Sequence, residues 1–413
     1  MTTSAKAPAQ AAAVLTIGGR PQEGGAGTYL VHNPARPAET VGQAPAADHA
    51  QLDASVQAAR RAAPAWRARD VGDRVAAVIA AATTASEQLT AQDTARLYTR
   101  EHGKVLSEAG SEIAMAPAVA SILAAMAETA LAPEQVDPAS RYPRLHREPY
   151  GVAALVLPFN WPLAVSMTKL TSALTAGNTA VVKVPPTCPL AALQFGAAFA
   201  AALPPGVVNM LAGPGHELGQ ALVSHPGIDV VSLTGGVATG RAVMAAAAQR
   251  LTPVLLELGG NDPAIIAPDL DITDQLVDQL VTATYTTCGQ VCMAIKRLYA
   301  PKRRVGELAD AVLARCDREV VGDGLADETT LGPLHTAAGR NRVDALVADA
   351  KAHGRQCAPP AGSATPTPVP GLLRAADRGH RFTTRLGAGH RGAVRSGIAD
   401  LRLRQHRRGG GRS

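Results

Sequence analysis

Three side chains of this 413-residue chain have the types needed for nucleophilic catalysis at a carbonyl carbon. Cys292 lies in the segment TCGQVCMA (287–294), and a thiolate at this position could attack an electrophilic carbon. Glu257 ends an apolar run in LELGGNDP (256–263) and could act as a general base on water. Asn160, in PFNWP (158–162), carries an amide that could donate to an oxyanion. The set therefore supplies one nucleophile, one base and one oxyanion donor.

Each of these residues also has a plainer interpretation. Cys292 could be an inert buried cysteine, and Glu257 a strand-end carboxylate paired with a lysine or arginine. Asn160 could be a turn residue whose side chain bonds its own backbone. Cys288 lies four residues before Cys292, but no histidine is close to either in the sequence, so we expect no zinc or other metal site.

A second group of residues could hold a nucleotide. Lys183 follows two valines at the end of a predicted strand, where its ammonium would suit ribose hydroxyls or a phosphate. Thr234, Gly235 and Gly236 form a strand-to-helix turn, and exposed N–H groups at a helix start favour a pyrophosphate. The alternatives are a solvated strand-end lysine and an ordinary glycine turn, since the segment lacks the G-x-G-x-x-G pattern.

The elements that must position these residues alternate between strands and helices. Residues 14–45 suggest short strands and turns, and residues 48–132 are mostly helical in pattern. From residue 152 the chain predicts strands at 152–157, 179–184, 207–211, 229–233 and 254–258, with helices at 189–203, 217–224 and 238–250. Such a βαβ series predicts an α/β fold with a parallel sheet covered by helices on both faces. Ligands then bind at the carboxyl ends of the strands.

The pattern also predicts how the chain divides. We expect a disordered N-terminus at 1–13 and a dinucleotide-binding domain at 14–258, with a possible β-ribbon arm for oligomerisation near 140–150. Residues 259–354 would form a partial catalytic domain, with a helix at 272–285 and a short strand at 297–300. Residues 355–413, rich in Pro, Gly, Ala and Arg, are of low complexity and are expected to be disordered or out of frame.

Composition narrows the classes of partner. The net charge of +6 comes from residues 355–413, which carry 12 arginines and two acids, while the remaining residues sum to −4. The basic balance is therefore no argument for a nucleic-acid partner. No run of about 18 apolar residues occurs, so no membrane span is expected. Five cysteines without a Cys-x-x-Cys pair favour free thiols and a cytoplasmic location.

The order and spacing of these segments resemble those of the NAD(P)-dependent aldehyde dehydrogenase superfamily. The resemblance runs from about residue 29 to residue 353 and includes NPA (33–35), EHGK (101–104) and LGPL (331–334). It implies a Rossmann-type parallel-sheet domain and an incomplete α/β catalytic domain. It also implies a reaction in which a small-molecule aldehyde becomes a carboxylic acid through a cysteine thiohemiacetal and thioester.

The resemblance assigns a role to each candidate residue. Cys292 would attack the aldehyde, Asn160 and the backbone N–H of Cys292 would hold the oxyanion, and Glu257 would activate water. The cofactor would be NAD or NADP, a choice left open because Pro186 stands where NAD-preferring members often have a glutamate. The implied cofactor-binding residues are Pro158, Phe159, Lys183, Pro186, Thr234, Gly235 and Gly236.

The chain departs from the family at residues 355–413. The family's Glu-x-Phe-Gly-Pro segment and its subunit-pairing strand are not found there, although the family usually forms homodimers or homotetramers. We expect that a change of reading frame replaced the C-terminal part of the protein. The alternative function is that of a truncated, non-catalytic relic that at most binds a dinucleotide.

Overall fold

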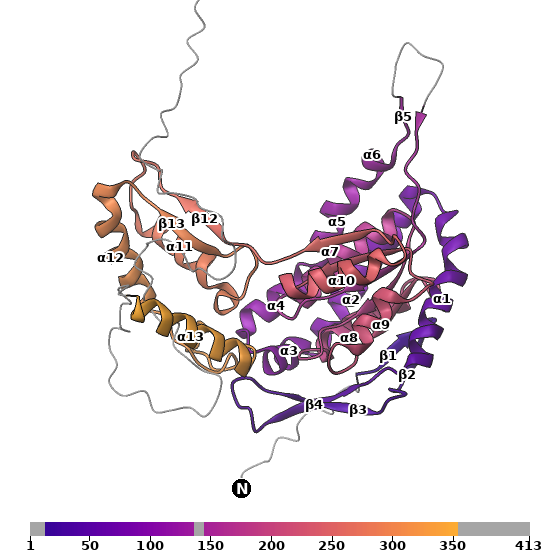
Figure 1. Ribbon diagram of the computed structural model, residues 1–413, viewed down its shortest axis with the longest axis horizontal. Helices are drawn as coiled ribbons and strands as arrows, with labels where there is room; N and C mark the ends of the chain where they lie inside the picture. The colour runs from indigo at the N-terminus through magenta and orange to yellow at the C-terminus, as the bar shows by residue number, and fades with distance from the viewer. Residues whose placement is uncertain (1–12, 136–143, 354–413) are drawn as a thin grey trace, which may run out of the picture.

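The computed structural model describes residues 13–135 and 144–353, so the predictions for the two ends lie outside the described residues. A larger lobe holds the main sheet and most helices, and a smaller lobe carries the described residues from 262 onward (Figure 1). The boundaries proposed for the domains stay predictions.

The larger lobe is built on a seven-stranded sheet in the order β11-β10-β7-β8-β9-β1-β2. The five strands from β11 to β9 are parallel, as the βαβ pattern predicts. The antiparallel extension by β1 and β2 was not predicted. The strands are β7 (Val152–Val156), β8 (Thr179–Lys183), β9 (Val208–Leu211), β10 (Val230–Thr234), β11 (Val254–Glu257), β1 (Leu15–Ile17) and β2 (Arg20–Gln22).

Helices cover both faces of this sheet, which confirms the predicted doubly wound arrangement. Helices α1 (His49–Arg67), α9 (Glu217–Ser224) and α10 (Val237–Ala248) lie on one face. Helices α7 (Pro162–Thr175) and α8 (Leu190–Ala201) lie on the other, with α2 (Val71–Ala91) packed over them. Helix α1 begins at a capping box, in which Asp48 accepts from the backbone of Gln51 and the Gln51 side chain accepts in return. Helix α7 was not predicted.

The central strands are buried on both faces. All five residues of β8 and all four of β9 are buried, as their continuous apolar sequences require. Strand β11 differs, because it pairs only with β10 and its residues alternate between half-buried and exposed. The strand predicted at 254–258 is therefore confirmed, but it is an edge strand rather than the buried strand that its apolar run suggests. Leu255, at 56% exposure, lies at the edge of the sheet.

The smaller lobe is a two-stranded parallel sheet with helices beside it. Strand β12 (Asp262–Ile265) pairs with β13 (Ile295–Tyr299), and α11 (Asp274–Tyr285) packs against α12 (Val305–Cys316). Helix α13 (Ala337–Ala352) follows, and a 3-10 turn, η1 (Thr286–Gly289), precedes the candidate nucleophile. A shorter one, η2 (Lys302–Arg304), precedes α12. The helix and strand predicted at 272–285 and 297–300 are confirmed, whereas β12, α12 and α13 were not predicted.

The remaining elements border the larger lobe. Strands β3 (Thr28–His32) and β4 (Thr40–Pro45) form an antiparallel pair, as do β5 (Glu134–Gln135) and β6 (Arg144–Leu145), close to the predicted ribbon. Residues 136–143 lie outside the described residues. Helix α3 (Thr94–His102) precedes α4 (Leu106–Ala114), α5 (Ala116–Ala125) and α6 (Ala127–Leu131). By length and composition alone the stretch Leu106–Leu131 could cross a membrane, and in the structure α5 packs on α2 and α7.

Candidate active site

Cys292 lies in the loop between η1 and β13 and is exposed, so the interpretation as an inert buried cysteine is wrong. Its backbone oxygen accepts a hydrogen bond from Lys296 Nζ. A Cβ atom placed on Gly260 would lie 2.7 Å from the same oxygen. The glycine pair that follows Glu257 therefore allows the base-bearing segment to approach the nucleophile loop closely.

The turn before Cys292 has an unusual backbone. Thr287, Cys288 and Gly289 have φ values of 54°, 55° and 72°, so three successive residues are left-handed. Only the glycine adopts this conformation without steric cost. Burial, with a smaller contribution from Glu108, raises the pKa of the Cys288 thiol to about 12. Cys288 is thus a half-buried thiol held in its protonated form, which separates it chemically from exposed Cys292.

Asn160 is brought directly to the nucleophile loop. Its Nδ2 donates to the backbone oxygen of Gln290 at 2.8 Å, across 130 residues of sequence. Its own backbone oxygen accepts from Lys104 Nζ at 3.1 Å. The interpretation of Asn160 as a turn residue that bonds its own backbone is therefore wrong. The amide contacts the loop at Gln290, two residues before Cys292, so it reaches the segment that carries the thiol.

Glu257 ends β11 with an exposed side chain. It stands opposite Thr234 in the parallel register, and its backbone oxygen accepts from Gly235 N–H at 3.0 Å. Lys169 of α7 is a buried neighbour that the sequence analysis missed, and its Nζ donates to Ser232 Oγ at 2.6 Å. Burial lowers the pKa of Lys169 to about 8, against the opposing effect of the Glu257 charge.

The two nucleotide-binding candidates lie at the carboxyl ends of β8 and β10, two parallel strands that flank β7 in the sheet. Lys183 is the last residue of β8 and is 5% exposed, so its interpretation as a solvated lysine is wrong. Burial lowers the pKa of Lys183 to about 8, and this residue forms no ion pair with any acid of the described residues. Gly236 is the N-cap of the 12-residue helix α10, and a Cβ atom placed there would meet nothing within 4 Å. An unpaired buried cation and an open helix start fit a phosphate-bearing ligand.

The other cofactor-binding candidates surround these two. Leu157 N–H donates to the backbone oxygen of Lys183, so Pro158 begins a loop beside that lysine. The Phe159 ring stacks on His335, with centroids 4.8 Å apart and planes at 6°. Pro186 is half-buried in the turn between β8 and α8. Nothing in this arrangement tests the contact of these three residues with a cofactor, so their roles stay predictions.

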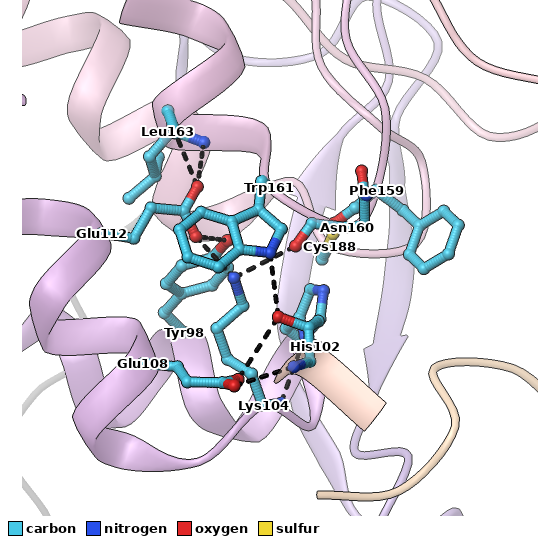
Figure 2. A network of polar contacts seen from close by, with 12 residues as sticks. Tyr98, His102, Lys104, Glu108, Glu112, Phe159, Asn160, Trp161, Leu163 and Cys188 are labelled. Carbon is cyan, nitrogen blue, oxygen red and sulfur yellow. Dashed lines mark hydrogen bonds and ion pairs between the residues drawn. The ribbon is translucent and has the colours of Figure 1, made fainter. Parts of the chain in front are cut away.

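A network of buried polar groups contacts the backbone of the loop that carries Asn160 (Figure 2). Lys104 and Glu112 form an ion pair in which both side chains are fully buried. Glu112 accepts from Tyr98 O–H at 2.7 Å and from the backbone N–H groups of Leu163 and Ala164, each at 2.9 Å, at the start of α7. Sequence reasoning missed this network. The sequence signal was the pair Glu108 and Glu112, four residues apart in α4. Burial of a carboxylate without a partner is costly, so such a pair indicates that partners exist.

A comparison with known proteins places this fold and site in one family. The family model described as the aldehyde dehydrogenase family matches residues 22–371. The chain therefore belongs to the aldehyde dehydrogenase family.

Individual relatives share the sequence and the fold. The chain is 32% identical to the chloroplastic betaine aldehyde dehydrogenase of Beta vulgaris over 326 residues, which are 76% of this chain and 65% of that protein. The chain thus spans just under two thirds of the length of that relative. A structure of betaine aldehyde dehydrogenase from Staphylococcus aureus with NAD+ matches with a TM-score of 0.77 and 29% identity, over 84% of this chain and 69% of the other. A 3,6-anhydro-L-galactose dehydrogenase with NADP matches with a TM-score of 0.76 and 28% identity, over 84% and 72%.

Proposed function

We propose that this protein oxidises a small-molecule aldehyde to the carboxylic acid with NAD or NADP. The observation that carries the proposal is the hydrogen bond from Asn160 Nδ2 to Gln290, because it sets an oxyanion donor beside the nucleophile loop. Membership of the family supports the reaction class. The alternative, a non-catalytic relic, has no feature of the described residues that favours it over the enzyme.

Each candidate residue has one chemical task in this proposal. The thiolate of Cys292 bonds to the aldehyde carbon, and the carbonyl oxygen becomes an oxyanion held by the Asn160 amide and the Cys292 N–H. A bound NAD or NADP would supply the oxidising equivalent by taking a hydride from the carbon bonded to Cys292, which would leave a thioester. Glu257 then takes a proton from the water that cleaves the thioester, which releases the acid and restores the thiol.

The described residues fit a dinucleotide cofactor. Lys183 would hold ribose hydroxyls or a phosphate, and the turn Thr234–Gly236 would present backbone N–H groups to the pyrophosphate. Pro158, Phe159 and Pro186 would line the same end of the sheet. The solved relatives with NAD+ and with NADP support either cofactor.

Purified protein with NAD or NADP and a panel of aldehydes tests the proposal at the absorbance of the reduced nicotinamide. We expect turnover that falls at least about a thousandfold in Cys292→Ala, because the nucleophile is lost. Cys288→Ala is the matched control and should retain turnover, since its thiol is half-buried and its raised pKa keeps it protonated. Cofactor binding without turnover on any aldehyde would instead support the relic.

Glu257→Gln separates the base from the nucleophile. We expect the steady-state rate to fall about a hundredfold or more, while one equivalent of reduced cofactor still forms rapidly, because the thioester accumulates. Rapid-mixing absorbance measures both phases. A variant that loses the rapid phase together with turnover would contradict the assignment of Glu257 as the base for hydrolysis.

We also propose a cytoplasmic location and a homodimeric or homotetrameric assembly. The four described cysteines are free, which supports a reducing compartment. Val237, Met244 and Leu251 are 49%, 55% and 89% exposed in or just after α10, which would suit a contact with a second copy. Light scattering on the purified protein tests the assembly.

A further inference from the structure

One half-buried carboxylate holds the left-handed turn that precedes the candidate nucleophile. Glu108 Oε1 accepts from the backbone N–H of Thr287 at 2.8 Å, although the two residues are 179 positions apart. Thr287 Oγ1 lies 3.4 Å from Glu108 Oε2 and accepts from Trp161 Nε1 at 2.8 Å. Glu108 of α4 and Trp161 at the start of α7 therefore both bind Thr287 in the nucleophile loop.

These contacts hold the part of the loop whose backbone conformation is least favourable. Thr287 and Cys288 both adopt a left-handed conformation that residues with a side chain disfavour. Such a conformation persists only when the surrounding structure enforces it. The turn determines where the chain emerges toward Cys292, four residues after Cys288. A change at Thr287 would therefore displace the thiol relative to the Asn160 amide.

The same cluster fixes the other half of the site. Lys104, paired with Glu112, donates to the backbone oxygen of Asn160 at 3.1 Å. Its ammonium also lies 4.6 Å from the ring centroids of Tyr98 and Trp161. The segment Lys104–Glu112 thus contacts the oxyanion-donor loop through Lys104 and the nucleophile loop through Glu108 (Figure 2).

We propose that Glu108 is a positioning residue, which holds the Thr287–Gly289 turn in its left-handed form and so sets Cys292 against Asn160. The hydrogen bonds of Glu108 go to Thr287, and none joins it to Cys292 or Asn160 in the described residues, so it acts through Thr287. The inference rests on the proposed function for its catalytic consequence. Its structural consequence, the protection of Cys288 and the placement of Cys292, can be measured without turnover.

The first experiment compares Glu108→Ala with Glu108→Gln, and Glu87→Ala serves as a control for removal of an exposed helical glutamate. Because displacement of a reacting group by about 1 Å can cost about a hundredfold, we expect kcat to fall ten- to a hundredfold in Glu108→Ala. The KM for the cofactor should stay within about twofold, since the cofactor elements are elsewhere. Glu108→Gln keeps an acceptor for Thr287 N–H and should recover kcat to within about threefold.

The second experiment maps alkylation by iodoacetamide with mass spectrometry. In the wild-type protein Cys292 should react readily and Cys288 slowly, because Cys292 is exposed whereas Cys288 is half-buried with a raised pKa. In Glu108→Ala we expect Cys288 to react at least about tenfold faster than in Glu108→Gln, because both variants remove the charge that raises the pKa of Cys288 and only the alanine lets the turn relax. Cys188, which is fully buried in the larger lobe, should stay protected in every variant and reports any general loss of structure.

A rescue variant separates positioning from general stability. Cys288→Gly places at a left-handed position the residue that prefers it and leaves the Trp161 contact to Thr287 intact. We expect it to be active alone and to restore kcat at least threefold in the Glu108→Ala background. A Glu108→Ala protein with unchanged kcat and protected Cys288 overturns the proposal. So does a loss of kcat that glycine does not restore, or one accompanied by labelling of Cys188.

If wild-type protein oxidises no aldehyde, the proposed function fails while the labelling pattern still decides the role of Glu108. Faster reaction of Cys288 in Glu108→Ala than in Glu108→Gln, with Cys188 protected, then supports the positioning role. Unchanged protection of Cys288 overturns it.

Discussion

The two lobes of the molecule differ in how they bury their strands. In the larger lobe β8 and β9 are wholly buried between helix layers. In the smaller lobe β12 alternates between half-buried and exposed residues, and Ile265 is 76% exposed. The candidate nucleophile belongs to the smaller lobe, yet the contacts that fix its loop come from Glu108, Asn160 and Trp161 of the larger one. The larger lobe therefore carries the cofactor elements and also sets the geometry of the thiol.

The largest effect should come from breaking the ion pair that is buried in the larger lobe. Glu112→Ala leaves the Lys104 ammonium buried without its carboxylate, so we expect the free energy of unfolding to fall by about 3–5 kcal/mol. Asp278→Ala removes an acid that pairs with Arg315 in the smaller lobe, where Asp278 is 54% exposed. We expect Asp278→Ala to lower the free energy of unfolding by no more than about 1 kcal/mol. Urea unfolding measures both, and equal losses would contradict the contrast between the lobes.

A matched pair of leucines tests the same contrast without charge. Leu170 of α7 is fully buried in the core of the larger lobe, and Leu255 of β11 is 56% exposed at the edge of the sheet. We expect Leu170→Ala to lower the free energy of unfolding by about 2–5 kcal/mol. Leu255→Ala should change it by no more than about 0.5 kcal/mol. A large loss in Leu255→Ala would show that another surface covers the edge strand in solution.

The smallest expected effect concerns Lys183 and pH. Because burial lowers the pKa of Lys183 to about 8, its ammonium is present below that pH and is lost as the pH rises through it. We expect the Kd for the dinucleotide to increase by about tenfold between pH 7 and pH 9. Calorimetric titration measures this dependence.

Two variants test whether Lys183 causes the pH dependence of the Kd. Lys183→Arg stays charged across the window and should show a flat pH profile. Lys169→Met should keep the wild-type profile, although burial also lowers the pKa of Lys169 to about 8. If Lys169→Met flattens the pH profile and Lys183→Arg does not, Lys169 and not Lys183 is the residue behind the pH dependence, which contradicts the prediction.

The sequence predicts well what depends on local pattern. The buried strands β7 to β10 follow from short apolar runs, and helices α8 and α9 between them from their sequence pattern. Helix α7 was missed because it begins at Pro162 and carries several hydroxyl residues, which obscure its apolar side. The exposure of β11 was also missed, because an apolar run does not reveal whether a strand is central or at an edge.

At the candidate site, residue types were predictable and partners were not. Cys292, Glu257 and Asn160 stand out in their motifs, and the structure brings Asn160 to the cysteine loop. The contact of Glu108 with Thr287 joins residues 179 positions apart, and no periodicity encodes such a pairing. The left-handed backbone at Cys288 was equally invisible, since it is imposed by tertiary contacts rather than by a glycine.

The hydrogen bond from Trp161 to Thr287 gives this protein an optical reporter of its own. The chain has two tryptophans, and Trp66 is 1% exposed, with its indole N–H bonded to the Leu174 carbonyl. In a Trp66→Phe background, the remaining emission would come from an indole that touches both the Lys104 ammonium and the nucleophile loop. Motions of that loop could then be followed in real time without any attached dye.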